Sequence, residues 1–371
     1  MTLQTESPAS TAEITLDNLL RTMCEKGSSD LHLAVASVPH ARLDGRLVVL
    51  DESLPVLDQT ILEKVLFPRL DTDQLEKLQK HRELDFSVSV PGLSRFRGNI
   101  LWQRGTLGAV FRAIPSRPLT LAELKLPQII EDLCNRPRGL VLVTGPTGSG
   151  KSTTLAAMID HINSNHEGHI VTIEDPIEFL HKNKKCIVRQ RELHADTMSF
   201  ANALKHVLRQ DPDVILVGEM RDLETIGLAV TAAETGHLVF GTLHTSSAAT
   251  TVDRIIDVFP SGQQQQIRMQ LSSTLQGVIS QTLIPRAEGK GRCCAMEIMV
   301  GTNGVRNLIR EGKTHQINNQ IQSGMSVGMQ SLNHALKTLV QSGAITADAA
   351  LMKSNAPDEL RGFLGLPMSN L

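Results

Sequence analysis

The sequence has few aromatic residues and no cysteine spacing of the kind that binds metals. Aromatic side chains make up 3% of the 371 residues, with one tryptophan and no tyrosine. Proteins that hold single-stranded nucleic acid stack the bases on aromatic side chains, so this composition argues against a nucleic-acid partner. The cysteines form no C-x-x-C pair, which excludes a common zinc site and a disulfide framework and predicts reduced thiols. They are Cys24, Cys134, Cys186, Cys293 and Cys294.

An excess of one charge and a long apolar run are also lacking. Lys and Arg number 37 against 39 Asp and Glu, a formal net charge of −2, unlike a protein that coats nucleic acid. No run reaches the roughly 18 apolar residues that cross a membrane. The polar start, residues 1–13, lacks the charged-then-apolar pattern of a secretion signal. We expect a cytoplasmic protein that is peripheral to a membrane at most.

What is present first is a chain long enough for two domains, with 41% hydrophobic residues. A flexible tail over 1–13 precedes a small α+β domain over 14–113 with an antiparallel sheet. Its predicted elements are a helix over 14–25, a hairpin turning at Asp44-Gly45, a helix over 58–80, an alternating strand over 86–90 and two strands over 95–113 that turn near Gly105.

A linker over 114–119, marked by two prolines, leads to a domain over 120–371. Short apolar runs over 140–144, 170–173, 214–217 and 238–242 alternate with helical stretches, which is typical of a parallel sheet wrapped by helices. From about 261 onward we expect mostly helix. The predicted fold class is α/β.

A complete phosphate-binding motif, G-x-x-x-x-G-K-[ST], lies between the first of these runs and a helical stretch. Backbone N–H groups of the loop and the helix N-terminus are expected to hold the phosphates of ATP. Lys151 would reach the terminal phosphates and Ser152 would bind Mg²⁺. The alternative is a chance glycine-rich turn. The predicted nucleotide-binding residues are Gly145, Pro146, Thr147, Gly148, Ser149, Gly150, Lys151, Ser152 and Thr153.

Three carboxylates follow the second apolar run, and Pro176 ends that strand. Glu174, Asp175 and Glu178 would lie on a turn at the edge of the sheet. Close carboxylates repel one another unless a cation or a water molecule is bound between them. Hydrolysis needs a positioned water, so the turn is a candidate for that role, and a solvated acidic loop is the alternative.

The third apolar run ends at Val217 and is followed by Gly218 and Glu219. The metal-side strand of P-loop NTPases usually ends in Asp, at the place Gly218 occupies here. Glu219 would then act on Mg²⁺ through a water molecule. Asp222 is explained by a helix cap alone.

Two histidines flank the fourth run, His237 before it and His244 after it. A histidine at a strand end is most often structural. His244 has the stronger functional case, because its strand should lie beside the phosphate-loop strand and its ring could hydrogen-bond the γ-phosphate.

Four arginines lie on the last strands of the first domain. Arg95 and Arg97 share a face by the strand period of two. A solvated sheet face explains any one of them, whereas a guanidinium brought to another subunit's phosphates would stabilise transition-state charge. Arg97 and Arg112 are the candidates for this role, ahead of Arg104.

Taken together, these motifs resemble the secretion ATPases of type II secretion and type IV pili. The resemblance runs from about residue 29 to 344 and rests on G-P-T-G-S-G-K-S-T-T, T-I-E-D-P-I-E, V-G-E-M-R-D-L-E-T and T-A-A-E-T-G-H-L-V-F-G-T-L-H-T. The segment Gly304-Val-Arg-Asn-Leu-Ile-Arg-Glu311 is similar to the A-I-R-N-L-I-R-E segment of PilT-type pilus retraction ATPases. Gly304 and Val305 replace the usual Ala and Ile. The chain shows neither the longer N-terminal region nor the tetracysteine zinc element of extension and secretion ATPases.

The resemblance implies a PAS-like first domain, a RecA-like ATPase domain and a homo-hexameric ring with ATP between protomers. It assigns water activation to Glu178, the atypical Walker B role to Glu219 and contact with nucleotide to Arg97 and Arg112. It further implies retraction of type IV pili through an inner-membrane platform protein at the cytoplasmic face, with room for a paralogous retraction ATPase. Loss of the γ-phosphate would let the domains swing apart about the linker.

Three other functions are compatible with parts of the sequence. An extension or type II secretion ATPase shares the motifs but usually has the zinc element. A nucleotide-bound docking subunit that does not hydrolyse ATP would not need the intact Lys151, Glu178 and Glu219. A DNA-handling RecA-like motor conflicts with the neutral charge and the few aromatic residues.

Overall fold

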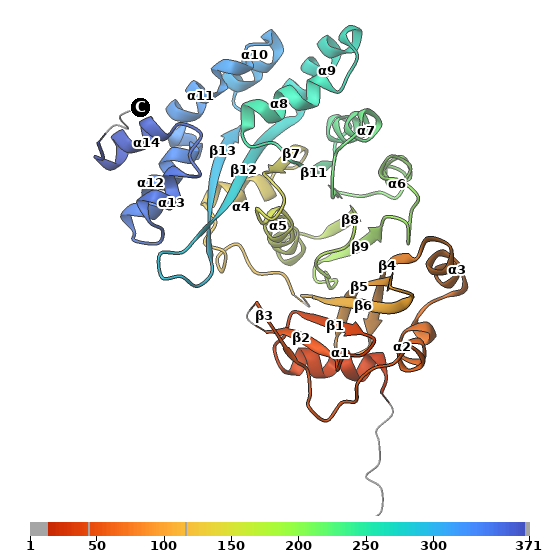
Figure 1. The fold of residues 1–371 in the computed structure, drawn as a ribbon. Helices are drawn as coiled ribbons and strands as arrows, with labels where there is room; N and C mark the ends of the chain where they lie inside the picture. Colours follow the sequence, from red (N-terminus) through yellow and green to blue (C-terminus); the bar gives the residue numbers. More distant parts are fainter. Residues whose placement is uncertain (1–13, 44, 116, 368–371) are drawn as a thin grey trace, which may run out of the picture. The chain divides into compact units, whose positions relative to one another are not determined.

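The computed structural model describes residues 14–43, 45–115 and 117–367 (Figure 1). The expected tail over 1–13 and Asp44 of the expected hairpin turn lie outside these residues. The chain divides into two compact units, unit 1 (Met1–Ser116) and unit 2 (Arg117–Leu371).

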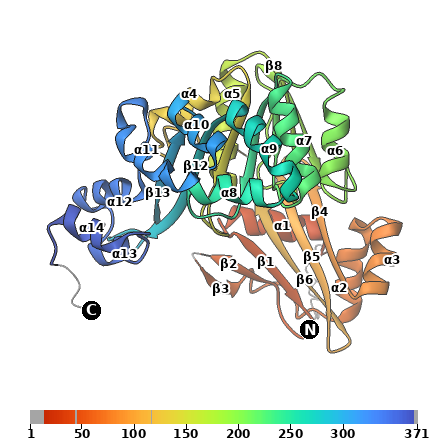
Figure 2. The same cartoon turned by 90° about the horizontal axis from the view of Figure 1, so that it is seen from above.

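Unit 1 is built on a six-stranded antiparallel sheet with the strand order β3-β2-β1-β6-β5-β4. Its helices cover the sheet through a core of leucines and phenylalanines (Figure 2). The strands are β1 Asp30–Ala34, β2 His40–Leu43, β3 Arg46–Val49, β4 Glu83–Val90, β5 Ser94–Gln103 and β6 Thr106–Ile114. The helices are α1 Leu16–Glu25, α2 Gln59–Leu66, the 3₁₀ turn η1 Phe67–Arg69 and α3 Thr72–His81.

The predicted antiparallel sheet is confirmed, and so is the turn near Gly105. Leu43 of β2 lies opposite Arg46 of β3, which leaves a two-residue connection. Strand β4 alternates between buried and exposed residues along its length. The β5–β6 hairpin turns at Arg104-Gly105, and Gly105 has φ +79°, a conformation that favours glycine.

The expected continuous helix over 58–80 is wrong. Helix α2 ends at Leu66, and Pro68 lies in the 3₁₀ turn that follows. Proline lacks the N–H that a helix interior needs. Asp71 then starts α3 with a capping box, in which its carboxylate accepts the Gln74 N–H at 2.8 Å. Pro68 and Asp71 together mark one helix end and one helix start.

Unit 2 contains a seven-stranded sheet with the order β13-β12-β7-β11-β10-β8-β9. The four predicted strands are present and parallel, and β7 lies inside the sheet between β12 and β11. The strands are β7 Gly139–Thr144, β8 Gly168–Glu174, β9 Cys186–Glu192, β10 Val214–Val217, β11 Leu238–Leu243, β12 Leu275–Pro285 and β13 Arg292–Val300.

Helices connect and cover these strands. Chain crossovers between parallel strands are right-handed, so α5, which leads from β7 to β8, lies on the opposite face from α7, which leads back from β10 to β11 (Figure 1). The helices are α4 Gln128–Cys134, α5 Lys151–Asn165, α6 Phe200–Val207, α7 Leu223–Glu234, α8 Ala248–Asp257, α9 Ser261–Thr274, α10 Asn303–Glu311, η2 Thr314–Gln316, α11 Ile317–Ser323, η3 Met325–Val327, α12 Leu332–Gln341, α13 Ala347–Leu351 and α14 Pro357–Leu364.

The expectation for the C-terminal third was incomplete. Helices are there, but β12 and β13 form a long antiparallel hairpin that joins the sheet beside β7. Buried polar residues, Ser280 and Gln281 on β12 and Glu297 on β13, interrupt the apolar pattern of these strands. Strand β9 was also missed, and it gives β8 neighbours on both sides.

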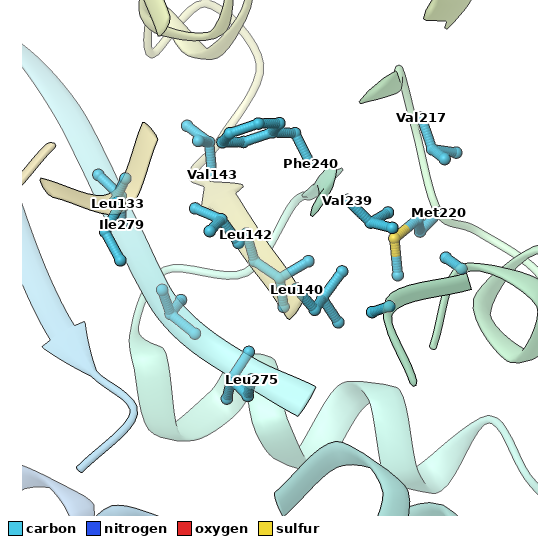
Figure 3. Close-up of a cluster of buried hydrophobic side chains, with 14 of the residues drawn as sticks. Leu133, Leu140, Leu142, Val143, Val217, Met220, Val239, Phe240, Leu275 and Ile279 are labelled. Carbon is cyan, nitrogen blue, oxygen red and sulfur yellow. The ribbon is translucent and has the colours of Figure 1, made fainter. Parts of the chain in front are cut away.

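The core of unit 2 surrounds β7 (Figure 3). Leu140, Leu142 and Val143 have no exposed surface, and they lie beside Phe240 of β11 and Ile279 of β12. Burying one such side chain is worth about 1.5–3 kcal/mol. The carboxyl end of β7, which leads into the phosphate loop, is therefore anchored in the buried core of the unit. Among the described helices, none has both the length and the apolar character needed to cross a membrane.

Candidate active site

The phosphate loop joins the buried strand β7 to helix α5, as the motif predicts. Gly150 is the N-cap of α5 and has φ +89°, and no side chain caps this helix end. Several other helices of unit 2 are capped by a side chain, for example α7 by Asp222 and α8 by Ser247. The first N–H groups of α5 are thus available to an anion, and the helix dipole favours negative charge there.

The loop forms a cradle that admits only glycine at its first position. A Cβ on Gly145 would lie 2.3 Å from the Gln281 carbonyl oxygen and 2.6 Å from Ser149 Oγ. Ser149 Oγ is buried and has no hydrogen-bond partner among the described residues. A buried hydroxyl without a partner is costly. The tight backbone and the spare hydroxyl both suit a bound phosphate.

Gln281 of β12 supports this loop through a hydrogen bond, and the sequence analysis did not identify it as a site residue. Its Nε2 donates a hydrogen bond to the Ser149 carbonyl at 2.7 Å. Its side chain is 3% exposed. Beside it, Thr144 Oγ1 and Ser280 Oγ are 2.7 Å apart. The buried polar residues that hide the strand pattern of β12 therefore bond the end of β7 and the phosphate loop.

Lys151 brings the loop and the acidic residues into one site. Its Nζ donates to the Gly145 carbonyl at 2.8 Å and to the Pro146 carbonyl at 3.2 Å. Burial lowers the pKa of Lys151, and the carboxylates of Glu219 and Glu178 act in the opposite direction. Lys151, Glu178 and Glu219 therefore share one electrostatic environment within unit 2.

The acidic turn after β8 separates its carboxylates by burial. Burial raises the pKa of Glu174 to about 7, while hydrogen bonds from Thr172, Gln190 and the Glu178 backbone oppose that rise. Thr172 Oγ1 donates to Glu174 Oε1 at 2.6 Å. Asp175 and Glu178 are exposed. Only Glu178, of the three, both faces solvent and influences Lys151, so it is the carboxylate best placed to contact a water molecule.

The end of β10 explains why glycine stands where the metal-side strand usually has Asp. The Gly218 N–H donates to the Ile173 carbonyl at 2.7 Å. A Cβ on Gly218 would lie 3.0 Å from that oxygen and 3.1 Å from Glu174 Cα. Strands β8 and β10 approach too closely here for a side chain. The acidic group is moved one residue on, to Glu219.

Glu219 and His244 lie together at neighbouring strand ends. His244 Nε2 is 3.0 Å from Glu219 Oε1, and Arg221 Nε is 2.5 Å from the same oxygen. Strand β11, which His244 follows, lies beside β7 as predicted. His237 has a structural partner, since its Nδ1 is 2.9 Å from the Ala232 carbonyl. Asp222 caps α7, with its Oδ1 accepting the Thr225 N–H at 2.9 Å.

The arginine candidates belong to unit 1. Arg97 of β5 and Arg112 of β6 are cross-strand partners. Arg112 Nε donates to Asp30 Oδ1 at 2.7 Å. Asp30 was not recognised in the sequence, because its partner is distant along the chain. Arg104 lies in the hairpin turn, about 23 Å of strand away from Arg97 at 3.3 Å per residue, so it does not join this group. Arg95 is half-buried on the same strand.

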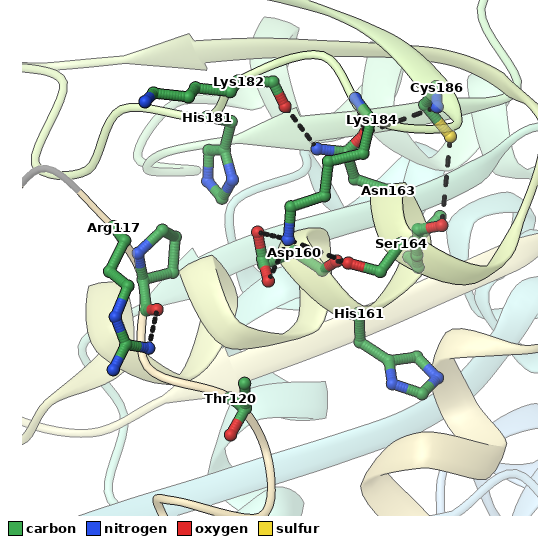
Figure 4. Close-up of polar contacts among 12 residues, drawn as sticks. Arg117, Thr120, Asp160, His161, Asn163, Ser164, His181, Lys182, Lys184 and Cys186 are labelled. Atoms are coloured by element: carbon green, nitrogen blue, oxygen red, sulfur yellow. Dashed lines mark hydrogen bonds and ion pairs between the residues drawn. The ribbon is translucent and has the colours of Figure 1, made fainter.

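A second polar network ties the segment after Glu178 to α5 (Figure 4). Lys184 Nζ lies 2.7 Å and 2.8 Å from the two carboxylate oxygens of Asp160. Asn163, with no exposed surface, donates to the Lys182 carbonyl at 2.7 Å. Its Oδ1 accepts the backbone N–H groups of Lys184 and Cys186. Burial lowers the pKa of His181 in this region to about 4.

Gly304, which stands where the family segment usually has Ala, has a local structural explanation. A Cβ on Gly304 would lie 2.6 Å from Gln320 Oε1. Gly304 therefore leaves space for the Gln320 side chain of α11. Val305 is fully buried in the core. Arg306 of the same helix donates to the Ser272 carbonyl at 2.9 Å, near the C-terminal end of α9.

Comparisons with known proteins give one consistent family. The family described as "Type II/IV secretion system protein" matches residues 109–351. The chain is 52% identical over 343 residues to the "Type IV pilus retractation ATPase PilT" of Pseudomonas aeruginosa, covering 92% of this chain and 99% of that protein. It is 49% identical over 344 residues to a "Twitching motility protein" of Neisseria gonorrhoeae, covering 92% and 91%.

Solved structures agree with these relatives. The crystal structure of "the Pilus Retraction Motor PilT and Bound ADP" is 45% identical, with a TM-score of 0.89 and coverage of 94% of this chain and 100% of that chain. The Legionella pneumophila ATPase DotB is 27% identical, with a TM-score of 0.81 and coverage of 93% and 97%. The predicted α/β fold with a P-loop ATPase unit is confirmed. The PAS-like description of unit 1 stays a prediction.

Proposed function

The chain belongs to the family of type II/IV secretion system proteins, and we propose that it is an ATPase that powers the retraction of type IV pili. The identity of 52% with a pilus retraction ATPase over almost all of both chains carries this proposal. It also confirms the resemblance that the sequence motifs indicated. Supporting it, Lys151, Glu178 and Glu219 lie in one electrostatic environment at the phosphate loop.

ATP is the substrate. The loop over 145–153 holds its phosphates through backbone N–H groups, and the uncapped N-terminus of α5 adds its partial positive charge. Lys151 exchanges its contacts with the Gly145 and Pro146 carbonyls for the terminal phosphates. Ser149 Oγ, which has no partner among the described residues, gains a phosphate oxygen as acceptor.

The residues at the loop also fit a Mg²⁺ ion that accompanies ATP. Across 14–43, 45–115 and 117–367, no three His, Cys, Asp or Glu side chains converge on a common metal position. Mg²⁺ typically keeps several waters and takes few protein ligands beside phosphate oxygens. Ser152 and, through a water, Glu219 would hold it, and the ion would neutralise charge on the phosphates. His244 and Arg221 orient the Glu219 carboxylate.

Glu178 activates the attacking water. Its carboxylate is exposed and acts electrostatically on Lys151, which supports this role. The neighbouring Glu174 is held by three hydrogen bonds in a half-buried position. One carboxylate is therefore structural and the other is available as general base.

Arg97 and Arg112 supply positive charge to a nucleotide bound by a neighbouring subunit. Two arginines directly opposite each other on adjacent strands repel, and an anion between or beside them removes that cost. Such a role requires an assembly in which unit 1 of one protomer serves unit 2 of another. A homo-hexameric ring of the kind proposed for this family meets the requirement.

Mechanical output follows from the loss of the γ-phosphate. Contacts that distinguish ATP from ADP are the only ones that can drive a conformational change. With domains over 14–113 and 120–371, the linker over 114–119 absorbs the movement. The ring acts at the cytoplasmic face of the inner membrane on a platform protein of the pilus machine, and a paralogous retraction ATPase can share this work.

Phosphate release from ATP tests the enzymatic part of the proposal. Wild type should release phosphate in a Mg²⁺-dependent reaction. Lys151→Ala and Glu178→Gln should each abolish most of the release while the melting temperature stays near that of wild type. Negligible release from wild type and both variants alike would instead favour a nucleotide-bound docking subunit.

A further inference from the structure

The turn that carries Glu178 is held by side chains rather than by strand pairing. Residues 175–185 connect β8 to β9. The Ile177 N–H donates to Glu192 Oε2 at 3.0 Å, and the Glu178 N–H donates to the Glu174 carboxylate. Side chains at the ends of β8 and β9 thus fix the backbone on the N-terminal side of Glu178.

Gln190 of β9 fixes the backbone on the other side. Its Nε2 donates to the Phe179 carbonyl at 2.8 Å and to Glu174 Oε1 at 3.1 Å. Its Oε1 accepts the His181 N–H at 2.8 Å. Both ends of the amide are used, and a half-buried amide engaged in this way has one orientation.

We propose that Gln190 is a positioning residue for Glu178 in ATP hydrolysis. Directly, it holds the peptide groups one and three residues after Glu178. Indirectly, it orients Glu174, whose carboxylate receives the Glu178 N–H. The inference rests on the proposed function, because it takes Glu178 as the water-activating carboxylate. Gln190 itself contacts the turn and Glu174, and its proposed role involves no contact with the substrate.

The far end of the same segment is fastened to the helix that begins at Lys151. Asn163 and Asp160 of α5 hold the backbone and the side chain of Lys184 (Figure 4). The segment that carries Glu178 is thereby attached both to α5, which follows the phosphate loop, and to β9. A displacement of about 1 Å at a catalytic group can cost about 10²-fold in rate, so loss of the Gln190 contacts should be visible in kcat.

Gln190→Met tests the proposal, because methionine keeps the length of the side chain and removes the three hydrogen bonds of the amide. We expect kcat for phosphate release to fall by about 10-fold to 100-fold. The dissociation constant for ATP, measured by titrating each protein with ATP, should stay within about twofold of wild type. Arg189→Gln, an exposed neighbour on the same strand, is the matched control and should leave both quantities unchanged.

The combination with Glu178→Gln separates positioning from general destabilisation. If Gln190 acts through Glu178, adding Gln190→Met to Glu178→Gln should not slow single-turnover hydrolysis further. If the Glu178→Gln rate falls to background, the double variant gives no information. The test then depends on Gln190→Met alone, which should lower kcat and leave the affinity for ATP unchanged. Should Gln190→Met melt well below wild type, Gln190→Glu replaces it, since it keeps the acceptor for His181 and loses both donors.

Three results would overturn the inference: an unchanged kcat in Gln190→Met, a parallel loss of ATP affinity, or rate losses that multiply in the double variant. Failure of the proposed function looks different. It would appear as no phosphate release from wild type, or as full activity in Glu178→Gln.

Discussion

Asp30 anchors Arg112 by one edge of its guanidinium and leaves the remainder exposed. Arg112 Nε lies 2.7 Å from Asp30 Oδ1, and the exposed fractions of the two side chains are 71% and 5%. Ser29 Oγ donates to the other oxygen of Asp30 at 2.6 Å. Burial acts to raise the pKa of Asp30, but hydrogen bonds from Ser29 and Arg112 outweigh it and the pKa is lowered. A pre-oriented arginine with an exposed fork suits a phosphate.

This arrangement predicts graded effects of two substitutions on the assembled protein. Arg112→Ala should slow ATP hydrolysis by roughly 10³-fold, the scale of an arginine acting in trans. Asp30→Asn keeps the arginine but weakens its anchor and should cost about 10-fold. ADP affinity, measured by fluorescence titration, should change little in either variant. A matching loss of ADP affinity in Arg112→Ala would make the residue a ground-state ligand, and Arg97→Ala is read by the same criterion.

The close approach of β8 and β10 predicts that Gly218 cannot be replaced. In Gly218→Ala the new methyl meets backbone atoms of Ile173 and Glu174 at 3.0 and 3.1 Å. The backbone of β8 cannot move away without disturbing the sheet, so we expect a loss of about 1–3 kcal/mol in the free energy of unfolding. Gly227→Ala in α7 is the control, because its methyl would lie 3.8 Å from the Phe259 ring. Equal stability of the two variants would contradict the reading of this contact.

Gln281 should govern nucleotide affinity without touching the nucleotide. Gln281→Leu removes the hydrogen bond to the Ser149 carbonyl and loosens the phosphate loop. A net contribution of about 1 kcal/mol corresponds to about fivefold weaker ADP binding. Gln276→Leu, on the same strand but bonded to the Arg138 carbonyl, should bind ADP as wild type does. Isothermal titration of both variants decides, and unchanged affinity in Gln281→Leu would refute the supporting role.

Glu174 should make stability depend on pH. Burial raises its pKa from 4.5 to about 7, so its contribution to stability is fully present below about 4.5 and is lost as pH rises through about 7. Glu174→Gln cannot ionise and lacks this loss. The unfolding free energy of wild type relative to the variant should therefore fall by about 2 kcal/mol between about pH 5 and about pH 8. Urea unfolding at both pH values measures it, and parallel behaviour of the two proteins would show that Glu174 titrates normally.

The phosphate loop and its strand could be predicted because the signals are local. A buried apolar run, a glycine-rich loop and a helix follow one another within residues 139–165. The alternating strand β4 and the glycine turn before β6 are equally local. Each depends on a few neighbouring residues whose conformational preferences agree.

Strands β9 and β12 could not be predicted because their side chains serve the site instead of a uniform core. Gln281 bonds the phosphate loop, which is remote in sequence, and Gln190 bonds the irregular turn before its own strand. Such polar positions resemble surface loops when only the pattern is read. Asp30 escapes for the same reason, since Arg112 is its partner across the sheet. The residues that hold catalytic groups in place become visible only through contacts between distant segments.

The most direct test is a count of surface pili in the host organism. The chromosomal gene is deleted and then restored either as wild type or as Glu178→Gln, with equal amounts of protein confirmed by immunoblot. The deletion and the Glu178→Gln strain should both carry excess pili that fail to retract, and wild type should restore normal numbers. Loss of pili in the deletion strain would contradict retraction and indicate an extension motor.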